Sequence, residues 1–481
     1  MIAPSLLCAV ALLARYSAAQ GTAENSTDII ATESGNGTTV ICGDYGKCTT
    51  MQYAMVEITK YRPMMRAAAA VTKQASDLPL QQYALGITAY KASMQVGTPP
   101  KNFNVLFDTG SFTMWLYGAT CTDAACKAAK NSYDVTKSST GAVVNGPPGS
   151  QSYADGSGYN GTLVQDTIIA SGYQVQNFKF TQVTNYRSSS PSGVSAADTY
   201  QDGIVGMGFH PRVAGASNTL IEQLVEDGHL PYPQFSWYIT LDEAQGYATF
   251  GGYDLTLFQD PKAQPAWVPM IVNDDLFIAG KLALPLVSVL VNGQTLETFT
   301  SHASPITGKA QGTTGAASWD TGTASSIVSD TLVTTLGGMI PGAKQVRFSG
   351  SKDISYVVPC SAKSEMGGPT VTLMFSGGGS LTITALEYVE ADENGDGNCF
   401  LALTGRAGGY RTGTYLIGNT FLKRYVNIFD FQKRWIGFAL ALGRNPAIAN
   451  VVQGTIKSSP GHYITFYSAV GAVAFSSLFL F

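Results

Sequence analysis

Residues 105–111 read Val-Leu-Phe-Asp-Thr-Gly-Ser, and residues 317–323 repeat the pattern as Ala-Ser-Trp-Asp-Thr-Gly-Thr. Apolar residues lead into each Asp, which is typical of a buried strand, and the Gly that follows permits a tight turn. We therefore expect Asp108 and Asp320 at the mouths of two strands. A single triplet of this kind would indicate only an ordinary turn.

The surroundings of the two triplets also match. Gly206, in Gly-Ile-Val-Gly, lies 98 positions after Asp108, and Gly418, in Leu-Ile-Gly, lies 98 positions after Asp320. Equal spacing of this kind indicates two halves built on one plan.

These features resemble the pepsin-like aspartic proteases over roughly residues 83–441, and the chain is similar to their GPI-anchored yapsin-type members. The resemblance implies an all-β, bilobal fold with two related β lobes and a few short helices. It also implies an endopeptidase that hydrolyses peptide bonds in proteins at acidic pH. Asp108 and Asp320 would share one proton and activate a water, and this family is itself the general example of two carboxyl groups that share a proton in this way.

The resemblance assigns supporting roles to the neighbouring residues. Ser111 and Thr323 would hydrogen-bond the outer carboxylate oxygens, and Thr109 and Thr321 would tie the two loops together. The full supporting set is Thr109, Gly110, Ser111, Thr321, Gly322 and Thr323. Two neighbours depart from the family pattern, because Phe112 replaces a Ser or Thr and Ala324 replaces a Ser.

A second segment, between residues 151 and 162, has the turn chemistry and alternation of a hairpin. It resembles the flap that closes over the cleft, with Tyr153 as the flap tyrosine and Trp115 behind it as either a buttress or a plain core residue. Asp155 is either a turn residue or a partner for a basic P1 side chain. The substrate-binding set is Tyr153, Asp155, Gly156, Ser157 and Trp115.

Two other functions remain open. One is a catalytically silent surface protein that keeps the fold for binding, and the other is a structural cell-surface glycoprotein in which the triplets are only turns. The starting residues of serine hydrolases and zinc proteases, Gly-x-Ser-x-Gly and His-Glu-x-x-His, are missing from the sequence. Residues 392–397 match half a calcium loop, but Leu403 stands where Glu should be, so we predict a hairpin tip, no metal and no cofactor.

Composition supports a β-rich protein with two cores. The 481 residues exceed the length at which single cores stop growing, and only 13% are charged while 52 are Gly. With 29 basic and 33 acidic residues the net charge is −4, which offers no basic surface for nucleic acid. The expected partners are protein or peptide substrates of a monomer.

The first 19 residues carry an apolar run and a small-residue cleavage pattern, which predict a signal peptide. Its removal leaves six cysteines, an even number in an oxidising compartment. Zinc binding is disfavoured because no pair has a Cys-x-x-Cys spacing. Proximity pairs Cys42 with Cys48, Cys121 with Cys126, and Cys360 with Cys399, of which the last two match bridged loops of the family.

We expect a prosegment over 20–79, an N-terminal lobe over 80–264, a C-terminal lobe over 265–445 and a tail over 446–481. Lys60 is the candidate basic residue that would pair with the catalytic carboxylates in a zymogen, although this basic stretch could equally be a solvated linker. Proline-rich residues 259–269 mark the lobe boundary. Short capped helices are predicted at 217–228 and 330–338, and a hairpin at Asn292-Gly293.

Targeting signals complete the sequence. Residues 463–481 lack charge, which favours a removed GPI signal over a simple hydrophobic anchor. We therefore predict the secretory pathway and the cell surface, with the vacuole as an alternative destination. Sequons predict glycans on Asn25, Asn36 and Asn160.

Overall fold

The computed structural model describes side chains and backbone over 90–448, apart from 154, 190–192, 194–197, 199, 210–217, 231, 272–279, 348–351, 392–397 and the side chain of 398. Before residue 90 it describes only the backbone of 30–34, 38–42, 48–51, 77–84 and 87–89. The chain divides into two compact units, Met1–Tyr53 with Ala67–Gln74, and Ala54–Arg66 with Ala75–Phe481. In the first unit β1 (Ile30–Ser34), β2 (Thr38–Cys42) and β3 (Cys48–Met51) form an antiparallel sheet.

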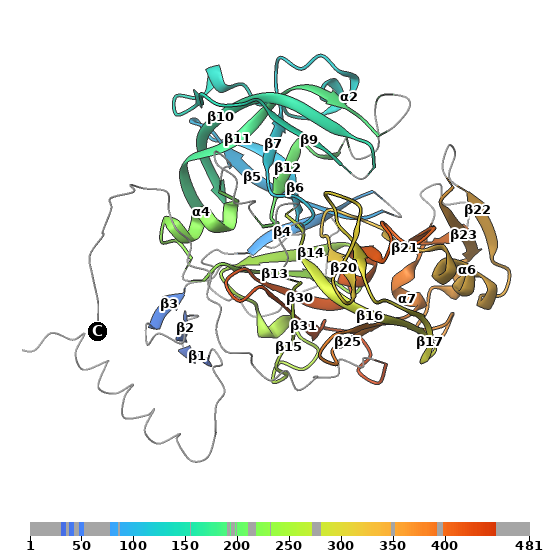
Figure 1. The fold of residues 1–481 in the computed structure, drawn as a ribbon. Helices are drawn as coiled ribbons and strands as arrows, with labels where there is room; N and C mark the ends of the chain where they lie inside the picture. Colours follow the sequence, from blue (N-terminus) through green and yellow to red (C-terminus); the bar gives the residue numbers. More distant parts are fainter. Residues whose placement is uncertain are drawn as a thin grey trace, which may run out of the picture. The chain divides into compact units, whose positions relative to one another are not determined.

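The second unit is built from two large sheets (Figure 1). The 14-stranded sheet has the order β15 (Ala266–Pro269), β31 (Trp435–Leu440), β30 (Tyr425–Asp430), β13 (Gln234–Ile239), β14 (Gln245–Phe250), β4 (Asp77–Ala84), β5 (Ile87–Val96), β6 (Lys101–Asp108), β12 (Gly203–Gly206), β7 (Met114–Tyr117), β11 (Tyr173–Arg187), β10 (Gly158–Ala170) and β8 (Ala142–Val143), with β9 (Gly149–Ser152) beside β10.

The 12-stranded sheet carries the second triplet. Its order is β25 (Ser380–Ile383), β24 (Val371–Phe375), β16 (Ala283–Val291), β20 (Gly315–Trp319), β29 (Thr414–Ile417), β21 (Ser326–Ser329), β28 (Leu403–Arg406), β23 (Ile354–Pro359), β27 (Asn398–Leu401) and β26 (Val389–Ala391), with β17 (Gln294–Thr298) beside β16 and β22 (Lys344–Arg347) beside β23. A small pair joins β18 (His302–Ala303) to β19 (Ala310–Gln311).

Helices are short and few among the described residues. They are α2 (Ala124–Ala128), α4 (Leu220–Glu226), α6 (Asp330–Met339), α7 (Ala385–Tyr388) and α8 (Asn419–Leu422). This strand-rich pair of sheets confirms the predicted all-β bilobal fold. None of these described helices is long and apolar enough to cross a membrane.

Each triplet occupies the same place in its sheet. Strand β6, which ends at Asp108, runs parallel to β12 and antiparallel to β5. Strand β20, which ends one residue before Asp320, runs parallel to β29 and antiparallel to β16. The residues that lead directly into the triplets, Val105–Phe107 in β6 and Gly315–Trp319 in β20, are buried and apolar or small, because both faces of each strand are covered there.

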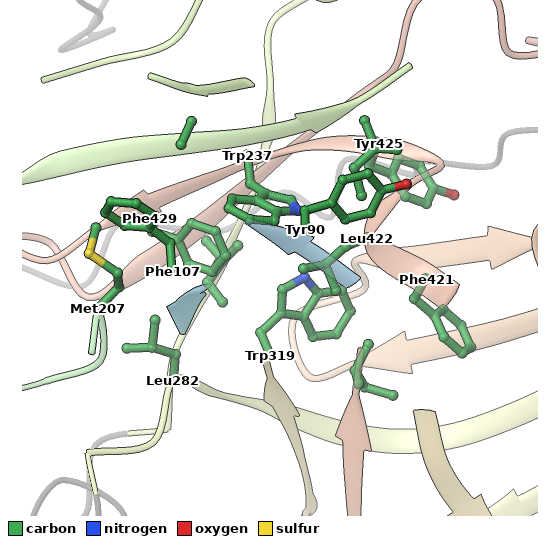
Figure 2. Close-up of a cluster of buried hydrophobic side chains, with 14 of the residues drawn as sticks. Tyr90, Phe107, Met207, Trp237, Leu282, Trp319, Phe421, Leu422, Tyr425 and Phe429 are labelled. Carbon is green, nitrogen blue, oxygen red and sulfur yellow. The ribbon is translucent and has the colours of Figure 1, made fainter. Parts of the chain in front are cut away.

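One hydrophobic core lies beneath both triplets (Figure 2). Phe107 precedes Asp108 and Trp319 precedes Asp320, and both side chains are buried in this core beside Leu282 and Trp237. The indole nitrogen of Trp319 donates to Asn427 Oδ1 at 2.9 Å, which satisfies the polar group of this buried side chain. The triplets therefore begin from rigid, packed strands.

Several local predictions are confirmed. Asn292 and Gly293 both have positive φ, 48° and 77°, and join β16 to β17 as the hairpin signal requires. Helix α4 forms, but it is shorter than predicted, since it begins at Leu220 after its capping residue Thr219 and ends at Glu226. Helix α6 forms too, but Gly337 and Gly338, which we expected to end it, lie inside the helix, which continues to Met339. A Cβ on Gly337 would lie 2.4 Å from Tyr356 Cε1, so close packing explains this glycine.

Two predicted disulfides are present, Cys121–Cys126 and Cys360–Cys399. Cys42 and Cys48 are register partners in the β2–β3 hairpin, but their side chains lie outside the described residues. The predicted signal peptide, Lys60, Asn25, Asn36, the calcium-like loop and nearly all of the tail also lie outside them.

The predicted domain limits cut through the large sheet. Strand β4 starts at Asp77, inside the predicted prosegment, and pairs with β14 and β5. Strands β30 and β31, inside the predicted C-terminal lobe, pair with β13 and β15 in the sheet that carries Asp108. The domain limits stay a prediction.

Candidate active site

The two Asp-Thr-Gly loops meet with their carboxyl groups facing. Asp108 and Asp320 are each 6% exposed. A Cβ placed on Gly110 would lie 2.3 Å from Asp320 Oδ2 and 2.9 Å from Asp108 Oδ1, and one on Gly322 would lie 2.4 Å from Asp108 Oδ1. A methyl group at either glycine would therefore collide with a carboxyl group, and only glycine allows this approach.

Reciprocal hydrogen bonds tie the loops together. Thr109 N donates to Thr321 Oγ1 at 3.0 Å, and Thr321 N donates to Thr109 Oγ1 at 2.9 Å. Each hydroxyl in turn donates across the interface, Thr109 Oγ1 to the Trp319 carbonyl at 2.8 Å and Thr321 Oγ1 to the Phe107 carbonyl at 2.7 Å. These four bonds are fully buried, so the separation of the two loops is fixed by a nearly symmetric network.

Each carboxyl group is held in the same way by its own loop. Gly110 N donates to Asp108 Oδ1 at 2.7 Å, and Gly322 N donates to Asp320 Oδ1 at 2.9 Å. The Ser111 hydroxyl donates to Asp108 Oδ2, and the Thr323 hydroxyl donates to Asp320 Oδ2 at 2.9 Å. The hydrogen bonds expected of the supporting set are thus all present.

The glycines found by the 98-residue spacing pack behind the triplets. A Cβ on Gly206 would lie 2.4 Å from Thr113 N, and one on Gly418 would lie 2.4 Å from the Thr323 carbonyl. Gly206 is also the register partner of Asp108 in the parallel β6–β12 pair. Both positions need glycine because backbone approaches backbone there.

The pair is electrostatically strained. Burial and the neighbouring charge of Asp320, together with a hydrogen bond between the carboxyls, raise the pKa of Asp108 to about 7, against the opposing effect of Ser111 and Lys281. Among the described residues no basic group lies within 4.0 Å of either carboxylate. Lys281 donates instead to the neutral Gly110 carbonyl, at 2.6 Å.

The predicted flap is a β9–β10 hairpin, with Tyr153 at its turn. Trp115 Nε1 donates to the Tyr153 hydroxyl at 2.7 Å. Trp115 is also fully buried among Tyr117, Tyr159 and Tyr186. Trp115 is therefore a core residue that also contacts Tyr153, and its role as a buttress of a flap stays a prediction. Burial raises the pKa of Tyr153 well above its ordinary value, and the charges of Tyr159 and Asp108 act in the same direction.

The tip of the hairpin uses the other predicted flap residues. Asp155 Oδ1 accepts hydrogen bonds from Ser157 N at 2.9 Å and from the Ser157 hydroxyl at 2.7 Å, which is the turn role. Gly156 has a φ of 88°, and its carbonyl accepts from Arg187 Nε at 2.9 Å. Asp155 itself is exposed.

The two departures from the family pattern have different surroundings. Phe112 lines a cavity of about 200 Å³ with Met114, Pro148 and Phe180. Ala324 packs against the aromatic cluster around Trp115, and its carbonyl accepts from Thr420. Phe112 is larger than the Ser or Thr of the family pattern, so it changes the shape of the space beside the first triplet.

Two residues that contact the triplets, Asn419 and Lys281, are distant from them in the sequence and were not predicted. Asn419 Nδ2 donates to the Thr321 carbonyl at 3.1 Å, and its oxygen accepts from Trp237 Nε1. Lys281 has no motif around it. For metals, a described group with suitable spacing is Cys121, Asp123 and Cys126, but its two sulfurs are joined to each other.

Comparison with known proteins agrees with this geometry. The eukaryotic aspartyl protease family model matches residues 89–441, so the chain belongs to that family, whose members are aspartic endopeptidases. Cathepsin E-A from Xenopus laevis is 30% identical over 354 residues, covering 73% of this chain and 79% of that protein. Cathepsin E-B from the same organism is 28% identical, covering 75% and 82%. The vacuolar aspartic protease of Candida albicans is 29% identical, covering 76% and 77%.

Proposed function

We propose that Asp108 and Asp320 are the catalytic pair of an endopeptidase that acts on proteins at acidic pH. The observation that carries this proposal is the pair itself, two buried carboxyls with matching hydrogen bonds and a pKa of Asp108 raised to about 7. A raised value of this kind belongs to both groups together, because one proton relieves the repulsion between them.

In the proposed reaction a water lies between the carboxyls. The ionised carboxylate takes a proton from this water as its oxygen attacks the peptide carbonyl carbon, while the protonated carboxyl gives its proton to the carbonyl oxygen. The carbon–nitrogen bond of the tetrahedral intermediate then breaks as the carboxyl that took the proton from water gives it to the amine nitrogen, while one hydroxyl of the intermediate returns its proton to the other carboxylate. The products are a carboxylic acid and an amine, and the pair again holds one proton.

The supporting residues act by position. Gly110, Ser111, Gly322 and Thr323 hold the four carboxylate oxygens, and the buried threonine network fixes the distance between them. Tyr153, held by Trp115, would close the cleft over the substrate. Whether Asp155 also binds a basic P1 side chain is tested by Asp155→Ala, which should lower cleavage after Lys relative to cleavage after Leu.

The decisive experiment is digestion of a denatured protein between about pH 3 and 5. Asp108→Asn and Asp320→Asn should each abolish turnover, while the matched control Asp227→Asn, an exposed acid at the end of α4, should not. Turnover should also decline as pH rises through about 7, because the pair then loses its shared proton. Full activity in either dyad variant would refute the assignment.

Neither the geometry of the described residues nor the family match favours the two other functions considered from the sequence, a catalytically silent binding protein and a structural glycoprotein. A wild-type chain that binds a statine-type inhibitor tightly but cleaves no member of an acid-pH peptide library would overturn the proposed activity, as would a substrate left intact with no inhibitor bound.

We also propose that the enzyme is a glycosylated monomer of the secretory pathway, displayed at the cell surface through a GPI anchor. The uncharged residues 463–481 and the exposed Asn160 support this location. Release of activity from cells by a phosphatidylinositol-specific phospholipase tests the anchor, and continued cell association after that treatment would contradict it.

A further inference from the structure

Lys281 places an ammonium group beside the candidate catalytic pair. Its Nζ donates to the Gly110 carbonyl at 2.6 Å, and the amide nitrogen of the same Gly110 donates to Asp108 Oδ1. The lysine and the carboxyl group thus bind the same residue. The lysine side chain is partly buried, so it is reached by solvent or by a ligand from the site.

The backbone around Lys281 is fixed against both triplets. Trp319 N donates to the Leu282 carbonyl at 2.8 Å, one residue before Asp320. On the other side, Gly280 has a φ of 67°, and a Cβ there would lie 2.5 Å from Phe112 Cδ1. The chain can approach Phe112 this closely only because Gly280 lacks a side chain. The backbone on both sides of Lys281 is therefore held in place against the two triplets.

The charge of Lys281 is not neutralised by the part of the chain that the structure describes. No described carboxylate lies within 4.0 Å of its Nζ, and the Gly110 carbonyl uses one of its three donors. A partly buried ammonium group is costly unless an opposite charge is near. The two aspartates keep one negative charge when they share a proton, but they lie beyond ion-pair distance and leave the ammonium group without a direct ionic partner among the described residues.

The charge of Lys281 does reach the reacting groups. Burial and Asp320 raise the pKa of Asp108, and Lys281 opposes them. Lys281 Nζ and Asp108 Oδ1 bind the same residue, Gly110, so a substrate bound across the two carboxyls would pass close to this ammonium group. Within the described part of the chain the Gly110 carbonyl is its hydrogen-bond acceptor, which leaves two of its three donors for an anionic group on that substrate.

We propose that Lys281 is a specificity-determining residue that binds a substrate carboxylate next to the scissile bond. The carboxylate is either an Asp or Glu side chain or the C-terminal carboxylate of a short substrate. This inference rests on the proposed function, because it takes Asp108 and Asp320 as the point of cleavage.

The test compares cleavage of matched peptides by the purified mature enzyme. Glu or Gln stands in turn at each position flanking the scissile bond, and a second series ends close to the bond as a free acid or an amide. At one position or terminus the acid form should have a kcat/KM on the order of 10-fold higher than its neutral form at about pH 5.5. The series in which the preference occurs identifies the source of the carboxylate.

The pH dependence of this ratio separates charge from shape. Each peptide pair meets the same dyad, so the titration of the dyad cancels from the ratio. The ratio should fall towards one as the substrate carboxyl becomes protonated, near about pH 3. It should also fall in high salt, because screening weakens a solvent-accessible ion pair.

Variants then assign the preference to Lys281. Lys281→Met should bring the ratio close to one, and Lys281→Arg should keep most of it. Lys101→Met is the matched control, because Lys101 also donates to a backbone carbonyl, Ser132 O at 3.0 Å, but is exposed and belongs to the outer end of β6. The control should leave the ratio unchanged.

The wild-type enzyme alone can overturn the proposal, whether or not the variants fold. Equal cleavage of acid and neutral peptides at every position and terminus would refute the role of Lys281 and leave the proposed protease activity intact. A preference that survives in Lys281→Met would refute it as well. Failure of the proposed function gives a different result, because the wild type would then cleave none of the peptides, or Asp108→Asn would still cleave them.

Discussion

A buried cluster of charged side chains lies at the C-terminal end of α8, and it leads to a prediction about stability. Lys423 is fully buried, and its Nζ lies 3.1 Å from Glu243 Oε1 and also contacts Glu390 Oε1. Lys363, 29% exposed, adds a weaker cation at 3.4 Å and 3.7 Å from the same two carboxylates. We predict that Lys423→Met folds at neutral pH but with a clear loss of stability.

The expected magnitude follows from what the substitution leaves behind. Methionine fills the space, but the carboxylates of Glu243 and Glu390, with side chains 8% and 3% exposed, lose their main cation. Breaking a buried pair in this way costs about 3–5 kcal/mol. The family match spans roughly 350 residues, and an unfolding entropy of about 2.1 cal/mol/K per residue converts that cost into a drop in Tm of about 4–7 °C.

The pH dependence has a definite sign. Burial alone would raise the pKa of Glu243, but Lys423 and Lys363 outweigh burial and hold the pKa below its ordinary value. A lowered folded-state pKa contributes stability above the unfolded pKa, and this stability is lost as pH falls through the folded value. Without Lys423 the carboxylates gain from protonation, so the cost of the substitution should shrink in acid.

Thermal unfolding of the wild type and Lys423→Met at about pH 7 and about pH 4 measures this effect. Lys344→Met, on the exposed strand β22, is the control and should change Tm little at either pH. An equal drop in Tm at both pH values would contradict the reasoning, because the loss would then come from packing and not from charge.

Three further predictions concern the site and its frame. Trp115→Phe keeps a ring in the core but removes the hydrogen bond to Tyr153, so kcat/KM on a peptide substrate should fall by roughly 3–10-fold; an unchanged value would argue against the buttress. Asp108→Asn should abolish activity but raise Tm at about pH 7 by an amount equivalent to about 1–3 kcal/mol. The raised folded-state pKa of Asp108 means that the pair is stable when protonated, at low pH, and loses this stability as pH rises through about 7, whereas Asn carries no charge at any pH. No gain in Tm would exclude electrostatic strain in the pair. Replacing Cys360 and Cys399 by Ser opens a loop of 39 residues and should lower the free energy of unfolding by about 4 kcal/mol, measured with denaturant. The same replacement of Cys121 and Cys126, with a separation of 5, should lower it by about 2 kcal/mol. The reverse order would show that strain, and not loop entropy, controls both bonds.

The sequence predicted what is local or repeated. Asp108, Asp320 and their supporting hydroxyls follow from two seven-residue stretches, and Gly206 and Gly418 follow from the equal spacing. Ser111 and Thr323 bond the Asp three positions before them, Gly206 is the register partner of Asp108 in the parallel β6–β12 pair, and the long-range pairing of Thr109 with Thr321 joins two copies of the same stretch. A pattern in one dimension records such relations directly.

Other features depend on contacts that no pattern records. Lys281 bonds to a residue 171 positions away, and its own neighbours, Gly, Leu and Ala, resemble any strand entrance. Helix α6 continues through two glycines because Gly337 packs against Tyr356, a tertiary contact that overrides the poor helix propensity of glycine. The pairing of β30 and β31 with the sheet of the first triplet is likewise set by the whole fold.

The difference between motif residues and residues that reach the site from distant parts of the chain also affects how the dyad works. The hydrogen bonds to Asp108 and Asp320 are nearly equivalent, so the repeated stretches alone give neither carboxyl a preference for the proton. Lys281 breaks this symmetry, because it binds the carbonyl of Gly110 in the first triplet and its charge opposes the rise in the pKa of Asp108. We therefore expect residues outside the motif to influence which carboxyl holds the proton. Changing Lys281 should shift the pH profile of turnover even for a substrate that carries no charge.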